Sequence, residues 1–125
     1  MTAFRTAVLE HFRHPRNRGP VDNATVSIDG ANPLCGDRIR IQLRIERDAI
    51  AAAGFTADAC ALCTAAASVL TEHVRGMTTG EATALDAAWI NSALGGEPPH
   101  GREKCAQLPL DTLRRAVASS SGVHE

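Results

Sequence analysis

Between Arg38 and Ile45 the chain alternates strictly between polar side chains and branched apolar ones. In an extended strand this period of two places every apolar residue on one face and every polar residue on the other. The apolar positions are Ile39, Ile41, Leu43 and Ile45. A strand with one buried face is typical of an antiparallel sheet that packs on a core with one side only. Residues 46–48 can form a turn, and residues 49–55, although rich in alanine, can form the returning strand.

Helical periodicity dominates the remaining segments. An amphipathic helix is predicted over residues 3–12, and it should end before Pro15, because the residue that precedes a proline is pushed out of the α region. Further helices are predicted over residues 60–74, 78–85, 86–94 and 104–118. Gly76 fits the C-terminal cap of the first of these helices, and Thr78 with Glu81 forms a capping-box pattern at the start of the next.

Shorter elements complete the predicted fold. Residues 25–28 are predicted as a short strand and residues 29–33 as a loop. Pro109 is expected near the first turn of the last helix, where a missing N–H has little effect, and residues 119–125 as a frayed polar tail. Strands followed by helices indicate one α+β domain over residues 1–125, with a small antiparallel sheet of about three strands packed against several helices.

Charge and composition exclude several classes of function. The 125 residues carry 13 Lys and Arg against 14 Asp and Glu, whereas nucleic-acid binders neutralise phosphates with an excess of cations. Aromatic residues make up 3% of the chain, too few for a base-stacking platform. The uncharged stretch over residues 59–71 is shorter than a membrane-spanning helix, and the N-terminus lacks an apolar signal-peptide core. We therefore expect a cytoplasmic protein that binds neither nucleic acid nor membrane.

The four cysteines are the candidate chemical groups: Cys35, Cys60, Cys63 and Cys105. In a reducing cytoplasm such residues are metal ligands or reactive thiols more often than structural disulfides. Cys60 lies where a predicted strand gives way to a helix, and Cys105 lies near the start of the last helix. Because helix N-termini favour anions, both positions suit the thiolates that soft metals and sulfur chemistry require.

A carboxylate lies close to the first cysteine. Asp37 follows Cys35 after Gly36, and a glycine between them allows the loop to turn both side chains toward one point. Three thiolates and one carboxylate could complete a tetrahedral zinc site or an incomplete iron–sulfur ligand set. The alternative is that each cysteine packs as a small apolar residue.

Four segments, in order along the chain, carry a resemblance to a known family. Residues 11–19, HFRHPRNRG, are similar to the signature H-[YF]-x-x-P-R-N-x-G, and residues 32–37, NPLCGD, resemble a first-cysteine loop. Residues 55–60, with the Ala/Ser-rich helix that follows, resemble a second-cysteine segment, and residues 104–105 with the last helix resemble a third. By these motifs the chain resembles the U-type iron–sulfur cluster assembly scaffolds, the IscU/NifU/SufU-like proteins.

This resemblance implies a fold, a function and a ligand set. The implied fold is the SufE/NifU-like α+β fold. Cys35, Asp37, Cys60 and Cys105 would hold a labile [2Fe–2S] cluster or Zn²⁺. Sulfur would come from a cysteine desulfurase, and acceptor or carrier proteins would receive the cluster. An oxygen ligand binds iron more weakly than a fourth thiolate would, which favours release.

Departures from the family patterns leave the branch open. The housekeeping scaffolds usually have a histidine before the third cysteine and a Leu-Pro-Pro-Val-Lys motif, whereas this chain has Lys104 and, over residues 97–102, EPPHGR. A lysine beside the third cysteine is similar to the zinc-dependent sulfurtransferase branch. That branch carries an insertion between its second and third cysteines, for which this chain is too short.

Several other residues have two interpretations each. Cys63 is an extra thiol at i+3 from Cys60, either a packed small residue or an alternative ligand or resolving thiol. His100 could replace the missing histidine ligand, or be an ordinary surface residue. Arg16 and Arg18 could bind an acidic partner surface, or form an ordinary basic turn.

Three hypotheses follow. The first is a scaffold that assembles and releases an iron–sulfur cluster. The second is a zinc-containing sulfur acceptor for a cysteine desulfurase, in which Cys105 would be the exchanging thiol. The third is a dithiol oxidoreductase that uses Cys60 and Cys63, although the surrounding pattern is not an alternating βαβ chain.

Overall fold

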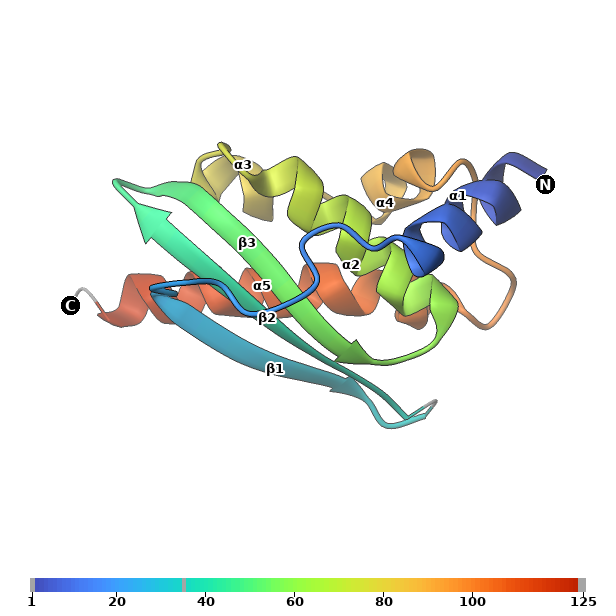
Figure 1. Cartoon of the computed structure of the whole chain (residues 1–125), viewed down its shortest axis with the longest axis horizontal. Coiled ribbons are helices and arrows are strands. Elements are labelled where there is room, and N and C mark those ends of the chain that lie inside the picture. The colour runs from blue at the N-terminus through green and yellow to red at the C-terminus, as the bar shows by residue number, and fades with distance from the viewer. Residues whose placement is uncertain (1, 35, 124–125) are drawn as a thin grey trace.

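The computed structural model describes residues 2–34 and 36–123, and within them the chain forms three strands and five helices. The strands are β1 (Val26–Asn32), β2 (Asp37–Glu46) and β3 (Ala49–Asp58). The helices are α1 (Thr2–Arg13), α2 (Ala61–Val74), α3 (Thr79–Thr83), α4 (Ala87–Ala93) and α5 (Glu103–Val123). Figure 1 shows the sheet lying against α2 and α5. The predicted α+β class with a three-stranded sheet is confirmed.

The sheet has the order β1-β2-β3, and both strand pairs are antiparallel. The alternation along β2 has the predicted effect, because Ile39, Ile41 and Leu43 are buried while Arg38 and Arg40 are exposed. Ile45, near the end of the strand, is partly buried. At the centre of the sheet, Ile41 lies opposite Ile28 on one side and Phe55 on the other. Ile41 and Phe55 are completely buried, so the central strand forms one wall of the core.

The first strand is longer than the sequence predicts. Residues 29–32, expected to form a loop, continue β1 and pair in register with residues 37–40 of β2. Gly30 lets α5 approach the strand closely, since a Cβ at this position would overlap the side chain of Thr112. The composition of this segment favours a loop, but hydrogen bonding to β2 and packing against α5 hold it in an extended conformation.

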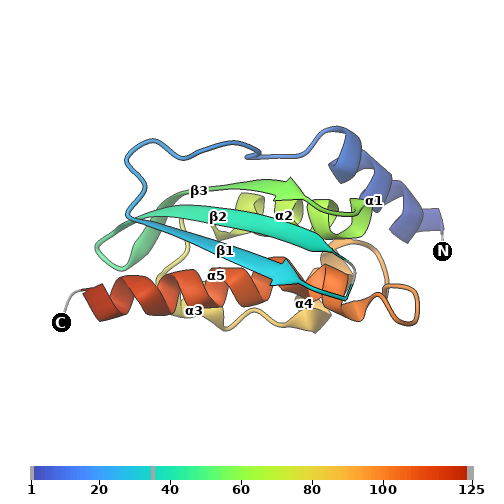
Figure 2. The same ribbon diagram turned by 90° about the horizontal axis from the view of Figure 1, so that it is seen from below.

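Two long helices cover one face of the sheet. α5 contacts β1 and β2, α2 contacts β3, and the two helices contact each other. Figure 2 shows α5 along one side of the sheet, with the segment between α1 and β1 on the opposite side. Most residues of α2 are buried, and many are alanines, so α1 and α5 can both pack closely against it.

The segment between α1 and β1 covers the outer edge of β3. The backbone N–H of Gly19 donates to the carbonyl of Phe55 (2.7 Å), and the N–H of Phe55 donates to the carbonyl of Asn17 (3.0 Å). These bonds satisfy backbone groups that an edge strand would otherwise expose. Gly54 permits the close approach, because a Cβ there would lie 2.8 Å from the carbonyl oxygen of Gly19.

The predicted caps of the middle helices are confirmed. The N–H of Glu81 donates to Thr78 Oγ1 (3.1 Å), and the N–H of Thr78 donates to Glu81 Oε1 (2.9 Å), which completes the capping box of α3. Asp86 caps α4 by accepting from the N–H of Trp89 (2.9 Å). Gly76 follows the end of α2 with φ of 89°, a conformation that favours glycine.

The last helix differs from the prediction at both ends. It begins at Glu103, so Pro109 lies in its second turn rather than near its start, and Pro109 is buried. Residues 119–123, expected to be part of a tail, are helical because α5 continues to pack along the sheet, and Ser120 is buried. Residues 124–125 lie outside the described residues. Across the described chain, neither α5 nor any other helix is long and apolar enough to cross a membrane.

A polar cluster joins α1, the turn after it and α2. Ser68, completely buried in α2, bonds to His11 Nδ1 (2.7 Å) and accepts from the backbone N–H of Arg16 (2.8 Å). The Arg16 guanidinium lies 3.3 Å from the same His11 nitrogen and binds Glu10 (3.0 Å). Burial and, next, the charge of Arg16 lower the pKa of His11 below its ordinary value of 6.5. A protonated ring would also lose its ability to accept at Nδ1.

The lowered pKa of His11 predicts a pH dependence of stability. Since the unfolded chain takes up a proton near pH 6.5 while the folded chain does so only at lower pH, stability is fully present above 6.5 and is lost as the pH falls below it. We expect the urea midpoint of unfolding to fall between pH 7.5 and 5.5, and to fall less in His11→Gln. His14→Gln, on the adjacent exposed turn, is the control. Equal falls in wild type and His11→Gln would contradict the prediction.

Candidate metal centre

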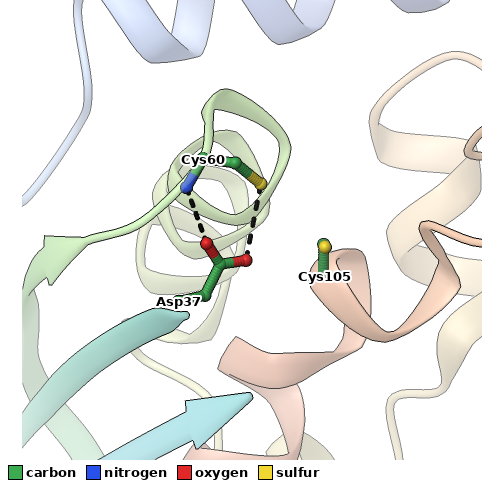
Figure 3. A group of neighbouring side chains, drawn as sticks. All are labelled: Asp37, Cys60 and Cys105. Carbon is green, nitrogen blue, oxygen red and sulfur yellow. Dashed lines mark hydrogen bonds between the residues drawn. The ribbon is translucent and has the colours of Figure 1, made fainter. Parts of the chain in front are cut away.

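The ends of three elements that are distant in sequence meet at one end of the sheet. Asp37 is the first residue of β2, Cys60 immediately precedes α2, and Cys105 lies in the first turn of α5. Figure 3 shows their side chains converging on one point. A carboxylate oxygen and the two Sγ atoms all lie within 4.8 Å of one another. This metal-binding group is the set of side chains, among the described residues, that could hold a metal ion.

Asp37 organises this group through two hydrogen bonds to Cys60. Its Oδ1 accepts from the Cys60 backbone N–H (2.9 Å), and its Oδ2 accepts from the Cys60 thiol (3.5 Å), as drawn in Figure 3. The carboxylate is 3% exposed. Burying a carboxylate is unfavourable unless it is hydrogen-bonded or paired with a cation, so these bonds hold the start of β2 against the start of α2.

Cys60 is the N-cap residue of α2. Its backbone is extended (φ −66°, ψ 167°), and its Sγ accepts from the N–H of Cys63 (3.5 Å). The sulfur therefore replaces the serine or aspartate oxygen that usually caps a helix. It lies where unpaired N–H groups and the helix dipole favour negative charge, which suits a thiolate ligand. Cys60 is partly exposed.

Cys105 brings the third ligand atom from the other covering helix. It is 2% exposed, and its N–H donates to the carbonyl of Arg102 (3.1 Å) in the first turn of α5. Cys105 and Cys60 thus both lie at helix N-termini that point toward the same carboxylate. The structure therefore brings together three of the four residues that the family resemblance implied as ligands.

Cys35, the fourth predicted ligand, lies outside the described residues. On its C-terminal side, Gly36 has φ of 75°, a conformation that favours glycine, and no atom lies within 4 Å of a Cβ built on it. The N–H of Gly36 donates to the carbonyl of Asn32 (2.9 Å), which turns the chain from β1 into β2. This turn delivers Asp37 to the metal-binding group.

The other candidate residues lie outside the metal-binding group. His100 is in an exposed loop, 4.0 Å from Glu103, and Lys104 is also exposed. Cys63 is completely buried in α2. Arg18 donates to the carbonyl of Ala57 (3.2 Å) on β3.

Arg102 belongs to the site although the sequence argument did not select it. Its guanidinium lies beside the Cys105 and Cys60 thiols, and these contacts raise the pKa of Arg102. A cation at this position favours negative charge on both sulfurs and can balance the charge of a metal–thiolate group. A basic residue three positions before a cysteine at a helix start was the available signal, but the surrounding Gly/Pro-rich loop makes such a residue look like a solvated side chain.

Comparisons with known proteins agree with the geometry. The sequence model of a family described as "NifU-like N terminal domain" matches residues 3–123. The chain is 29% identical to the zinc-dependent sulfurtransferase SufU of Bacillus subtilis, over 97% of this chain and 93% of that protein. It is 34% identical to the iron-sulfur cluster assembly scaffold protein IscU 1 of Archaeoglobus fulgidus, over 88% of this chain and 71% of that protein.

A solved structure has the same fold. FiSufU, a SUF-system protein of Fervidobacterium islandicum AW-1, superposes with a TM-score of 0.80 at 23% identity, over 93% of this chain and 97% of that one. The expected SufE/NifU-like arrangement of a sheet covered by helices is therefore confirmed for this chain.

The contacts of Arg102 predict its effect on thiol reactivity. In metal-free protein, Arg102→Gln should slow iodoacetamide alkylation of Cys60 by roughly two- to fivefold, as expected for loss of a solvent-exposed ion pair. Arg102→Lys should retain part of the wild-type rate, since it keeps the charge but loses the planar set of donors. Mass spectrometry of the Cys60 peptide gives the rate. If alkylation proceeds at the wild-type rate in Arg102→Gln, the guanidinium does not act on this sulfur.

Proposed function

The chain belongs to the NifU-like N-terminal domain family, and from this we propose that it is a scaffold that assembles a labile [2Fe–2S] cluster and transfers it to acceptor proteins. In this role Cys35, Asp37, Cys60 and Cys105 hold the cluster as cargo. The observation that carries the proposal is the convergence of one carboxylate oxygen and two Sγ atoms within 4.8 Å of one another.

The chemistry of the ligand atoms supports a cargo of iron and sulfide. Thiolates are the usual ligands of iron–sulfur clusters, and two of the described ligands are thiols at helix N-termini. Asp37 offers an oxygen, which binds iron more weakly than a thiolate does. A mixed set therefore favours a cluster that can leave.

The position of the group supports transfer to another protein. Cys60 is partly exposed, and Arg102 beside it is exposed. The ligands come from the ends of a strand and two helices rather than from the middle of the core. We propose a cysteine desulfurase as the sulfur donor, and iron–sulfur acceptor or carrier proteins as the recipients.

A zinc-containing sulfur acceptor is the second candidate. It is favoured by the 29% identity to a zinc-dependent sulfurtransferase over 97% of this chain. The same residues would bind Zn²⁺, for which one carboxylate with thiolates is a suitable tetrahedral set. Zinc would stabilise the site, and one thiol, with Cys105 as the expected one, would take sulfur from a desulfurase persulfide.

Anaerobic reconstitution tests the scaffold proposal directly. Incubation with ferrous iron, cysteine and a cysteine desulfurase is expected to produce sulfide-to-iron charge-transfer bands in the visible spectrum of the wild type. These bands should be lost in Cys60→Ala and kept in His100→Ala, whose side chain is exposed and outside the group. A colourless wild type that still accelerates the desulfurase would favour the zinc sulfur acceptor. Bands that persist unchanged in Cys60→Ala would contradict the proposed ligand set.

Asp37→Ala should separate the two candidates. In a scaffold, the cluster should become longer-lived, because the exchangeable oxygen ligand through which it leaves is missing. In a sulfur acceptor, zinc affinity should fall at least about tenfold, and sulfur transfer should change. Asp37→Asn keeps an acceptor for the Cys60 N–H and controls for loss of that bond. If cluster lifetime, zinc affinity and sulfur transfer are all unchanged, Asp37 is not a ligand.

A further inference from the structure

One thiol of the metal-binding group is also part of a CxxC pair, and the other thiol of that pair has no role in the group. Cys60 and Cys63 form a CxxC pair across the first turn of α2, and only Cys60 belongs to the group found among the described residues. The three described cysteines are all thiols in this structure. Cys63 is therefore a completely buried thiol beside a proposed cluster ligand.

The two thiols differ in accessibility. Cys60 is partly exposed, whereas Cys63 is completely buried. A sulfur donor from solution therefore reaches Cys60 before it reaches Cys63. This order, an exposed attacking thiol followed by a buried second thiol, is the arrangement that thiol exchange within a CxxC motif requires.

The contacts around Cys60 prepare it for attack on a persulfide. Its thiol donates to Asp37 Oδ2 (3.5 Å), so the carboxylate can accept its proton. The Arg102 guanidinium lies beside the same sulfur, and the N–H of Cys63 donates to it (3.5 Å). A proton acceptor, a cation and a backbone donor therefore surround the sulfur that a donor reaches first.

We propose that Cys63 resolves a persulfide formed on Cys60 and so releases sulfide at the assembly site. First, Cys60 attacks the outer sulfur of a donor persulfide R–S–SH, which gives Cys60–S–SH and the thiol R–SH. Next, Cys63 attacks the Cys60 sulfur, the Cys60–S–SH bond breaks, and a Cys60–Cys63 disulfide forms while H₂S leaves. The transferred sulfur gains two electrons, and the two cysteine thiols lose two electrons and two protons.

This reaction supplies the form of sulfur that cluster assembly consumes. A desulfurase delivers sulfane sulfur, whereas a cluster contains sulfide, so two electrons must be added to each sulfur atom. The dithiol provides them for one turnover. An external thiol or dithiol reductant must then restore the pair. The inference rests on the proposed function, because sulfide is needed at this site only if a cluster is assembled there.

The backbone permits closure of the disulfide. The Cys60 sulfur lies 3.5 Å from the backbone nitrogen of Cys63, so it already lies against the residue that carries the second thiol. Cys60 is the N-cap residue at the junction between β3 and α2, with extended backbone angles, and its carbonyl accepts the first helical bond from the N–H of Thr64 (3.0 Å). Rotation about its Cα–Cβ bond can turn the sulfur toward Cys63 while the backbone of α2 stays in place.

The test uses metal-free, fully reduced protein, glutathione persulfide as the donor, and no reductant or oxygen. Wild type is expected to release about one sulfide per chain. Peptide mapping of alkylated samples should show the Cys60–Cys63 disulfide by the loss of two hydrogens. In Cys63→Ser, sulfide release should slow by at least about tenfold, since an intramolecular nucleophile is lost. A peptide of this variant should then carry one added sulfur on Cys60.

Two further variants control for folding. Cys63→Ala removes the thiol without adding a hydroxyl and should behave like Cys63→Ser. Ala66→Ser adds a hydroxyl at an equally buried position one turn along α2 and should release sulfide like the wild type. Sulfide release from both Cys63 variants at the wild-type rate would overturn the inference. So would the absence of the Cys60–Cys63 disulfide from wild type, a result that does not depend on any variant.

Cluster reconstitution of the same wild-type batch separates this inference from the proposed function. Failure of wild type to form charge-transfer bands with added sodium sulfide and ferrous iron would count against the scaffold itself. Bands that form with added sulfide, together with sulfide release that does not depend on Cys63, would leave the scaffold intact and reject only the resolving role of Cys63.

Discussion

The packing of α2 and α5 on one face of a three-stranded sheet is the constraint on which the site depends. Both helices bury their apolar residues against β2 and β3 or against each other, with Ile41, Phe55 and Leu70 completely enclosed. This packing fixes the axes of both helices, and their N-termini lie beside the first residue of β2. Cys60 and Cys105 are far apart in sequence, and it is this packing that brings them to the same carboxylate.

The same constraint explains which features were predictable from the sequence. The β2 strand, the hairpin with β3 and the caps at Thr78 and Asp86 depend on neighbouring residues, and all were predicted. The second half of β1 was missed, because residues 29–32 are extended only through pairing with β2 and contact with α5. The extension of α5 beyond residue 118 was missed for a similar reason.

The residues of the candidate site also fall into those that the sequence predicts and those that only the fold reveals. Asp37, Cys60 and Cys105 were candidates from the sequence because both thiols lie near predicted helix starts, the carboxylate follows Cys35 after one glycine, and all three match family motifs in order. Arg102 carries no such signal, since an arginine in a Gly/Pro-rich loop is an ordinary surface residue until the fold places it beside two thiols. Charge partners that reach a site from an adjacent loop require the tertiary structure to be recognised.

The hydrogen bond between the Cys60 thiol and Asp37 has a consequence for loading of the site. The Cys60 thiol donates to Asp37 Oδ2 (3.5 Å), so this hydrogen-bonded pair shares one proton. Any cation that binds both atoms must displace that proton, so binding of the cation releases a proton, and protons compete with the cation for the site. The cation and the proton therefore bind to the same pair of atoms as alternatives. Local acidification would favour the hydrogen-bonded form of the pair and release of the cation.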